Sequence, residues 1–562
     1  MKKLIACALS AVTMMASLSG CSFLNGGNGG NGGDSGWKDY DNLADYIATE
    51  YDNEAVVEAD ETSAGDVQSW AAEVFTKSGG NNDMPTENAL IKSPWHTLKV
   101  NGKEVPVYTA RCAKGPHSFV WLDVTSNKND FALKLELTMD EEYPKCVILP
   151  ESANVAVKKE SSTYTCYLTE YGSYTYTFSD DATAEFTDPT LSPLTIMVTE
   201  EMEIDIPDGY ETVEIEPGYY EVNDLKFTQE DTVYIMKEGL HEISSVRIPS
   251  NSILYLERGA YLKVTDRGSD ATGWNRDNAM TVGGEADNAH VISRGLIDCG
   301  GVLGGDGKYK HVFNMSRCTN SSVEGLTIIN GNTWTMCFYN CDNIEVNRNL
   351  LLAYRTYSDG IMMSECRNSS GRYNFVRTGD DAVEYKGTGW GGKNDGSDCI
   401  YEYNDVWTDK ATAYGLTWES ECNMSNMVFR NNHVGFAQPT WNSGNNALDC
   451  RLGTNATKRW GDIIFENIEI YYVICPNVIT TTVSGNGAIL ENVLFKNITV
   501  KGVEPGTVLY MMSFAAAGGS IADIKLQDIN FCGKEIERAD KDDPMICVNK
   551  APAFYDDALS IR

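Results

Sequence analysis

The feature that most constrains the fold is a repeat in the C-terminal two thirds of the chain. An apolar residue follows an Asn or Asp by one or two places in each unit, at Leu350, Phe375, Val406, Val434, Ile468, Ile498 and Ile529. With Leu326 counted as an earlier member, successive members lie 24, 25, 31, 28, 34, 30 and 31 residues apart. Each unit holds apolar runs of only a few residues. Strands this short cannot close a core alone, so the units must stack and bury their inward faces against one another.

The residue types within the repeat favour strands over helices. The units are rich in β-branched residues and Asn, and they lack the long runs with a 3.6-residue period that a helical repeat would show. We therefore predict an all-β chain whose residues 207–562 form a right-handed parallel β-helix. The recurrent Asn residues suit inward-pointing amides at the corners of the coils, which is a structural role.

A different pattern precedes the repeat. At 562 residues the chain exceeds what one hydrophobic core usually organises, so at least two domains are expected. Residues 84–206 contain short alternating runs, such as Ala132–Leu137 and Tyr174–Phe178, separated by turn residues. This pattern predicts an antiparallel β-sandwich. Residues 37–83 are polar and acidic, and no function is assigned to them.

The first 36 residues have the features of an export and anchoring signal. Residues 1–20 combine two lysines, an apolar run from Leu4 to Met15 and small residues, in the order of a secretory signal too short to span a bilayer. Leu18–Cys21 resembles the lipobox of bacterial lipoproteins, which implies a lipid on Cys21 and a protein anchored outside the bacterial cell; a plain cleaved signal is the alternative. Residues 21–36 are mostly Gly and Asn and are expected to be a flexible tether.

The composition narrows the choice of partner. The net charge is −35, from 80 acidic and 45 basic residues. This charge repels phosphate backbones and no basic stripe interrupts it, so nucleic-acid binding is not expected, and polyanionic substrates are mildly disfavoured. Phosphate-loop and zinc motifs are absent, so we predict neither a cofactor nor a metal. The chain is expected to act as a monomer on a polysaccharide.

Three carboxylates stand out against the repeat. Asp359 lies in Tyr357–Met363, and Asp380 and Asp381 follow 21 and 22 residues later, just under one coil. Equivalent positions on adjacent coils lie about 4.8 Å apart, so the three can converge on one face. Such crowding raises at least one pKa and leaves an acid beside an ionised partner, as glycoside hydrolysis requires. Ordinary turns are the alternative for each motif taken alone.

These motifs resemble those of the β-helical glycoside hydrolases of families 28 (polygalacturonases) and 49 (dextranase and isopullulanase). In both families an Asp-Gly turn precedes an Asp-Asp pair, as Ser358–Gly360 precedes Gly379–Asp381 here. The resemblance covers about residues 207–530 and implies that Asp380 is the general acid. It also implies that Asp359 and Asp381 orient and deprotonate water, with inversion at the anomeric carbon. Family 49 enzymes carry an N-terminal sandwich, as residues 84–206 would.

Two departures from the polygalacturonases bear on the substrate. Where those enzymes have Gly-His-Gly and Arg-Ile-Lys, this chain has Tyr414 in place of the His and Gly453 in place of the Lys, which leaves Arg451 alone. A galacturonate carboxylate would need a cation in its pocket. A neutral α-glucan such as dextran or pullulan is therefore the expected substrate, with a polygalacturonase-like pectin hydrolase as the alternative.

Several residues near the aspartates are candidates for substrate binding, although core packing is the alternative for each aromatic ring. They are Tyr357, Tyr385, Trp390, Tyr414, Trp418, Trp441, Glu419 and Arg451. A Gly-rich insertion, Gly387–Ser397, can wall a cleft, act as a lid or form a plain surface loop.

Two other classes of function remain open at this stage. A calcium-dependent polysaccharide lyase would use the clustered aspartates as oxygen ligands. A non-catalytic glycan-binding lipoprotein would rely on aromatic platforms and would not need the carboxylates.

Overall fold

A computed structural model of the chain describes residues 56–59, 91–125, 131–202, 204–265, 279–300, 311–331, 333–392, 394–438, 446–453, 457–474, 477–504, 510–516, 518–536, 546–549 and 559–561. The expected signal at 1–20, the lipid site at Cys21, the tether at 21–36, most of the polar segment 37–83 and Trp441 lie outside these residues. Among the described residues, no helix has the length and apolar character that crossing a membrane would require.

The N-terminal domain is a β-sandwich of two sheets that enclose one core. The seven-stranded sheet contains β1 (Val56–Ala59), β2 (Ile91–Lys92), β5 (Tyr108–Cys112), β6 (Gly115–Thr125), β8 (Lys145–Leu149), β11 (Gly172–Ser179) and β12 (Leu194–Glu200). The five-stranded sheet contains β3 (His96–Val100), β4 (Lys103–Val105), β7 (Leu133–Met139), β9 (Lys158–Glu160) and β10 (Thr163–Leu168). A short 3₁₀ turn, η2 (Glu151–Ala153), follows β8. The pairing is antiparallel as expected, except that β12 runs parallel to β6.

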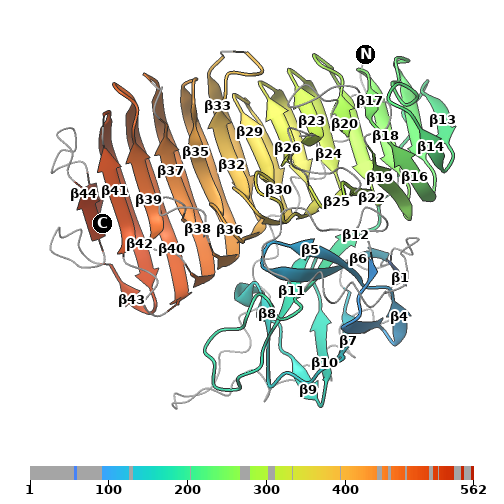
Figure 1. Cartoon of the computed structure of the whole chain (residues 1–562), viewed down its shortest axis with the longest axis horizontal. Helices are drawn as coiled ribbons and strands as arrows, with labels where there is room; N and C mark the ends of the chain where they lie inside the picture. The colour runs from blue at the N-terminus through green and yellow to red at the C-terminus, as the bar shows by residue number, and fades with distance from the viewer. Residues whose placement is uncertain are drawn as a thin grey trace.

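The rest of the chain winds into a parallel β-helix, seen edge-on as a row of stacked strands in Figure 1. One face is an 11-stranded sheet of β17 (Val246–Ile248), β20 (Met280–Val282), β23 (His311–Ser316), β26 (Thr333–Tyr339), β29 (Ile361–Ser364), β32 (Val383–Gly387), β35 (Tyr414–Ser420), β37 (Leu448–Leu452), β39 (Asn477–Val483), β41 (Tyr510–Ala516) and β44 (Ile546–Asn549). The predicted fold class, a parallel β-helix preceded by a β-sandwich, is confirmed.

The other faces of the β-helix belong to one 22-stranded sheet that bends around a corner of the coils. Its strands are β13 (Glu211–Ile215), β14 (Gly218–Tyr220), β15 (Thr232–Met236), β16 (Gly239–Ile243), β18 (Ser252–Leu256), β19 (Ala260–Val264), β21 (Ala289–Ser293), β22 (Leu296–Asp298), β24 (Thr319–Glu324), β25 (Thr327–Ile329), β27 (Asp342–Asn347), β28 (Leu350–Leu352), β30 (Ser370–Arg372), β31 (Phe375–Thr378), β33 (Gly396–Glu402), β34 (Asp405–Thr408), β36 (Met424–Ala437), β38 (Arg459–Val473), β40 (Ile489–Val503), β42 (Ser520–Phe531), β43 (Lys534–Glu535) and β45 (Leu559–Ile561).

The observed register follows the sequence repeat, with three corrections. On the side of the preceding coil, Leu350 pairs with Thr327 rather than with Leu326. Leu350 pairs with Phe375 as expected, but Phe375 pairs with Asp405 rather than with Val406. Further on, Ile468 pairs with Asn432 rather than with Val434. This last difference arises because Ile468 occupies the position that an Asn occupies in the preceding coils.

A ladder of buried Asn side chains runs along one corner of the stack. The Nδ2 group of Asn349 donates to Oδ1 of Asn374 at 2.9 Å, Asn374 donates in the same way to Asn404 at 2.8 Å, and Asn404 donates to Asn432 at 3.1 Å. All four residues are fully buried. The inward-pointing role that the sequence predicted for the recurrent Asn is therefore confirmed for these four, whereas Asn467 and Asn497 of the later coils are exposed.

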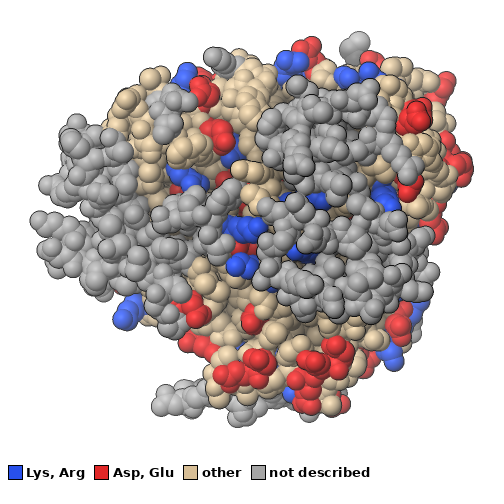
Figure 2. Space-filling view, viewed as in Figure 1, with Lys and Arg blue, Asp and Glu red and all other residues tan. Residues whose placement is uncertain are grey.

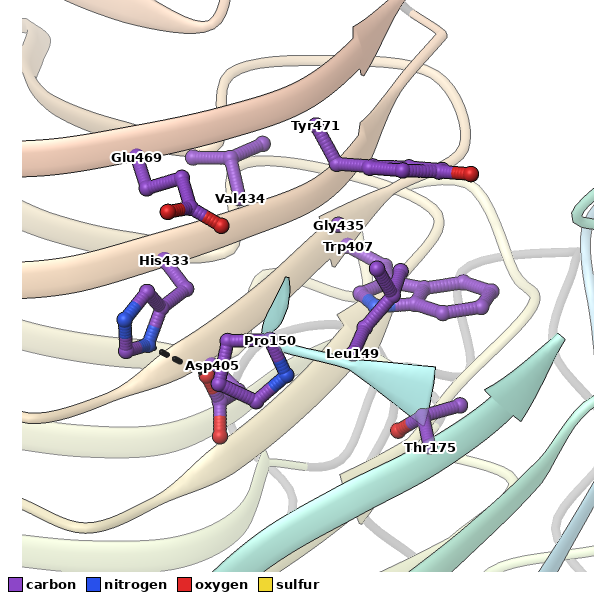
Figure 3. A pocket seen from close by; sticks show the side chains of 10 residues that line it. All are labelled: Leu149, Pro150, Thr175, Asp405, Trp407, His433, Val434, Gly435, Glu469 and Tyr471. Carbon is purple, nitrogen blue, oxygen red and sulfur yellow. Dashed lines mark hydrogen bonds and ion pairs between the residues drawn. The ribbon is translucent and has the colours of Figure 1, made fainter. Parts of the chain in front are cut away.

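The sandwich docks on the β-helix through a shared apolar cluster. Phe119 and Trp121 of the sandwich pack with Phe375 and Trp407 of the β-helix in one buried group. A small pocket at this junction is lined by residues of both domains, and Figure 3 shows the ion pair between His433 and an aspartate at its edge. None of the three candidate catalytic carboxylates lines this pocket.

Buried ion pairs join the two domains around this cluster. Asp123 of β6 contacts Arg294 of the β-helix at 2.8 Å, and Arg377 lies 3.1 Å from both Asp409 and the ring of His117. On the face shown in Figure 2, acidic side chains gather over the sandwich, whereas several basic ones lie near the middle, between the domains.

We expect the substitution Asn404→Ala to lower the free energy of unfolding by about 2–4 kcal/mol, because it removes the buried hydrogen bonds that the Asn404 side chain makes with Asn374, Gly371 and Asn432. Urea denaturation followed by tryptophan fluorescence measures the change. The control is Asn347→Ala, at a half-buried corner where the amide makes only a 3.5 Å contact with Glu345. It should cost under about 1 kcal/mol. Equal losses in both variants would argue against a stabilising ladder.

Candidate active site

Two turns on consecutive coils position the aspartates. Asp359 lies between β28 and β29, and Asp380 and Asp381 lie between β31 and β32, one coil later. The Gly360 N–H donates to the Asp381 carbonyl at 2.9 Å, which fixes one turn on the other. A Cβ at Gly360 would lie 2.2 Å from the carbonyl oxygen of Ala382, so only glycine allows this approach. The glycine of the Asp-Gly motif is therefore required by the stacking of the turns.

The structure brings the predicted carboxylates together and adds a fourth. Carboxylate oxygens of Asp359, Asp381 and Glu384 all lie within 4.8 Å of one another. Asp380 immediately precedes Asp381 in the sequence, and the Asp381 N–H donates to Asp380 Oδ1 at 2.9 Å. The exposed fractions of Asp359, Asp380 and Asp381 are only 2%, 6% and 7%. The four acids therefore share one nearly enclosed place.

This cluster lies outside the core of the β-helix. Along β32, Val383 and Tyr385 belong to the buried core, so the alternate residues Glu384 and Lys386 point to the opposite face of the sheet. Because the aspartates surround Glu384, they lie on this outer face as well. The convergence that the sequence predicted for them is therefore present.

Lys386 is the centre of the cluster. Its Nζ lies 2.7 Å from Glu419 Oε2 and 3.1 Å from Glu384 Oε2. It also lies 3.8 Å from Oδ2 of both Asp359 and Asp381. One buried ammonium group thus offsets part of the repulsion among four carboxylates, without which their burial would be far more costly.

The same geometry bears on metal binding. Among the described residues, Asp359, Asp381 and Glu384 form the group whose carboxylates are close enough to share an ion. Each of them already contacts Lys386, so the chain supplies its own cation where a metal would lie. The donor set therefore fits an ammonium group.

Burial dominates the titration of the cluster. It raises the pKa of Asp380 to about 7, with a further contribution from the charge of Asp381, while Lys386 acts in the opposite direction. Burial also raises the pKa of Glu384 to about 8 and that of Asp359 well above its usual value. Near neutral pH the cluster therefore holds protons on some carboxyl groups beside others that are ionised.

Polar residues of the following coils extend the site. Thr417 donates a hydrogen bond to Glu384, and the Thr412 N–H donates to Asp381 Oδ1 at 3.0 Å. On β37, Arg451 forms an ion pair with Asp449 at 3.2 Å, and burial raises the pKa of Asp449 to about 7. The predicted contacts Glu419 and Arg451 therefore lie in or beside the cluster.

The structure bears on one of the two departures from the polygalacturonases, the glycine at position 453 in place of a lysine. A Cβ at Gly453 would lie 2.3 Å from the carbonyl oxygen of Trp418, so a lysine could not stand there without moving the neighbouring coil. The site nevertheless contains a second cation, Lys386, two strands closer to the aspartates.

The aromatic candidates divide into two groups. Tyr357, Trp390 and Trp418 are exposed by 45%, 59% and 45% of their surface, as a ring that contacts substrate would be. Tyr385 and Tyr414 are fully buried, and their hydroxyl groups donate to the carbonyl oxygens of Val428 and Asn404 inside the β-helix. The assignment of these two tyrosines to substrate binding was wrong, because their places in the strand alternation point them into the core.

Sequence reasoning missed Glu384, Lys386 and Asp449. The signal was available in the strand alternation: Val383 and Tyr385 point inward, and so do Leu448 and Cys450. Glu384 lies between the first two, three residues after Asp381, and Asp449 lies between the second two, two residues before Arg451, so both must face outward beside the aspartates.

Comparison with known proteins agrees with this geometry. Residues 269–542, which include the strands from β20 to β43, match the family model described as Glycosyl hydrolases family 28. Among curated proteins, none matches the chain. The family match confirms the resemblance of the chain to the β-helical glycoside hydrolases.

Solved structures share the fold at low sequence identity. Dex49A from Penicillium minioluteum is 13% identical, with a TM-score of 0.61 over 89% of this chain and 97% of its own. The family 28 exopolygalacturonase of Yersinia enterocolitica is 13% identical, with a TM-score of 0.42 over 76% and 96%. Endopolygalacturonase I from Stereum purpureum is 11% identical, with a TM-score of 0.41 over 63% and 95%. Because Dex49A aligns along nearly the whole of both chains, its likeness extends over the sandwich as well as the β-helix.

Proposed function

We propose that this chain, a β-helical glycoside hydrolase of the type found in families 28 and 49, cleaves α-glycosidic bonds in a neutral polysaccharide, an α-glucan such as dextran or pullulan. The proposal assigns the chemistry to Asp359, Asp380 and Asp381. It rests on the charge of the site more than on any other observation.

The described side chains around the cluster carry more acid than base. The acids are Asp359, Asp380, Asp381, Glu384, Glu419 and Asp449, and the bases in contact with them are Lys386 and Arg451. Both bases already form ion pairs with carboxylates of the chain. A uronic acid entering here would bring another negative charge beside these carboxylates, whereas a neutral sugar would not.

Asp380 is proposed as the general acid. Its pKa of about 7, raised by burial, keeps a proton on the carboxyl group at mildly acidic and neutral pH. An acid in this state can protonate the oxygen of the leaving sugar as the glycosidic bond breaks.

Asp381 is proposed as the base that deprotonates the attacking water, with Asp359 holding the same water. Their nearest oxygens lie within 4.8 Å, and one water about 2.8 Å from each of two acceptors can bridge such a gap. Burial raises the pKa of Asp359 well above its usual value, which suits an orienting group better than a base. Attack by this water on the side opposite the leaving group would invert the anomeric carbon, as the family resemblance implies.

A pectin-type substrate is the second candidate. The match to the family 28 model and the presence of Lys386 and Arg451 near the aspartates favour it. A calcium-dependent lyase finds no support in the family match.

The test is a screen of dextran, pullulan, α-1,3-glucan and polygalacturonate for new reducing ends. We expect release from a neutral α-glucan, undiminished by a chelator and without the ultraviolet absorbance of a new double bond. NMR of the first product should show the inverted anomer. Release from polygalacturonate alone would overturn the choice of substrate, and release from none of the four would overturn the proposal.

A matched pair of variants tests whether the activity depends on the site. Asp380→Asn should lower kcat by about 10²–10⁴-fold, because the amide cannot donate the acid's proton. Asp398→Asn makes the same change at an exposed corner of β33, where the carboxylate bonds Asn426 at 2.6 Å, and should leave kcat unchanged.

The rate should also depend on pH in a defined direction. Asp380 acts protonated and its pKa is about 7, so kcat/KM should fall about tenfold per pH unit above that value. Lys386 lowers this pKa, so Lys386→Met should move the alkaline limb to higher pH, whatever it does to the maximal rate. A pH profile of both proteins measures this, and a limb that moves to lower pH would contradict the assignment of the acid.

Finally, we propose that the enzyme is exported and anchored to the outside of the bacterial cell through a lipid on Cys21. The supporting observation is the sequence of residues 1–36. In cells expressing the full chain, a labelled fatty acid should appear on the wild-type protein and be absent from Cys21→Ala, which should leave the membrane fraction. Equal labelling of both would count against the anchor.

A further inference from the structure

A small apolar patch lies beside the carboxylates on the side of the N-terminal coils. It consists of Trp334, Cys337, Tyr339 and Met362, buried together apart from the main core. Met362 pairs with Glu384 on the next strand, so the patch directly adjoins the acidic cluster. Lys386 connects the two, because its Nζ lies 5.2 Å from the ring of Trp334 as well as 3.8 Å from Asp359.

Trp390 covers this patch from the Gly-rich insertion. Its ring stacks on Trp334 with centroids 5.0 Å apart and planes at 15°, and it lies 6.0 Å from the ring of Tyr339. Even so, 59% of Trp390 is exposed, more than any other large apolar residue that the structure describes as exposed. The indole is therefore packed on the patch and still accessible to solvent over much of its surface.

Buried polar groups hold the segment that carries Trp390 in place through hydrogen bonds. Glu365, which is fully buried, accepts hydrogen bonds from the Gly389 N–H and, at 2.9 Å, from the Ser364 hydroxyl. The Thr388 N–H donates to the same Ser364 oxygen at 3.0 Å. These bonds fix the start of the insertion on the coil that precedes β32.

A second attachment lies on the far side of Trp390. Asn340 donates to the Gly391 carbonyl at 3.2 Å and accepts from Asn394 at 3.1 Å. A Cβ at Gly391 would lie 2.8 Å from the Cβ of Tyr339, so the segment reaches back across two coils with glycine at the contact. The insertion is thus a fixed support that presents one tryptophan beside the catalytic carboxylates.

We propose that Trp390, supported by Trp334, is a sugar-binding platform that holds a neutral pyranose unit of the polysaccharide on the N-terminal side of the carboxylates. Aromatic faces bind the C–H face of a pyranose ring by dispersion and burial, and the neighbouring carboxylates accept its hydroxyl groups. A charged uronic acid would be repelled by the same carboxylates. This inference rests on the proposed hydrolysis of a neutral glycan, and it adds where on the protein the polysaccharide lies.

The kinetic test compares variants on the polysaccharide that the wild-type enzyme cleaves. Trp390→Ala should raise KM about tenfold with kcat changed less than about twofold, and Trp390→Phe should fall between Trp390→Ala and the wild type. The control is Tyr403→Ala, which removes a 44% exposed ring stacked on Tyr373 on the other sheet and should leave KM unchanged. An unchanged KM in Trp390→Ala would overturn the platform while leaving the hydrolase intact.

A binding test separates this inference from the function on which it rests. In the Asp380→Asn background, isomalto-oligosaccharides and maltodextrins are titrated by calorimetry with and without Trp390→Ala. We expect binding by one of the two probes, weakened about tenfold by Trp390→Ala. Gly391→Ala, which keeps the tryptophan but forces its support away from Tyr339, should weaken binding in the same direction. Binding that is equal in all three proteins would refute the platform, even if the wild type cleaves the polysaccharide.

Discussion

Hydrogen bonding between parallel strands of successive coils holds equivalent residues about 4.8 Å apart, and the site depends on that spacing. The turn that carries Asp359 rests on the turn that carries Asp381 through the bond from the Gly360 N–H. The insertion after β32 reaches back to Asn340 by crossing coils with the same spacing. A change in coil register would move the acids, the lysine and the aromatic patch together.

Bringing the carboxylates together is unfavourable because like charges repel, and Lys386 offsets much of this repulsion. Four carboxylates lie around one ammonium group on a face that is nearly closed to water, where like charges repel most strongly. The remaining repulsion and the burial raise the pKa values of Asp380 and Glu384 to about 7 and about 8. Burial of the carboxylates therefore has two effects. It makes the cluster electrostatically costly, and it leaves an acid that keeps its proton near neutral pH.

The sandwich contributes to this arrangement from outside the site. It packs on the β-helix through the cluster that contains Trp407, and Arg377 of the β-helix, which forms a buried ion pair with Asp409, lies 3.1 Å from the ring of His117 of the sandwich. Arg377 lies in β31, the strand that leads directly into the turn of Asp380 and Asp381. The Lys114 N–H of the sandwich also donates to Asp409 at 3.0 Å. The docked domain thus packs against the strand that leads into the turn of Asp380 and Asp381, although it supplies none of the carboxylates.

The sequence by itself determined the repeat, the β-class of the coils, the Asn corners and the three aspartates, because each of these depends on residue type and spacing along the chain. It placed Asp359 one coil from Asp381 correctly. It could not give the direction of each side chain, and for this reason Tyr385 and Tyr414 were assigned to the surface although they fill the core. Nor did it give the register where Ile468 replaces an Asn.

Only the tertiary structure decided that Glu384 and Lys386 join the aspartates and that Trp390 stacks on Trp334, 56 positions earlier in the chain. These contacts arise between coils and across an insertion, where the loop lengths and the inward or outward alternation of each strand combine. Spacing along a chain fixes which residues can meet in a solenoid. The packing of whole coils decides which of them face the same side and share their charges.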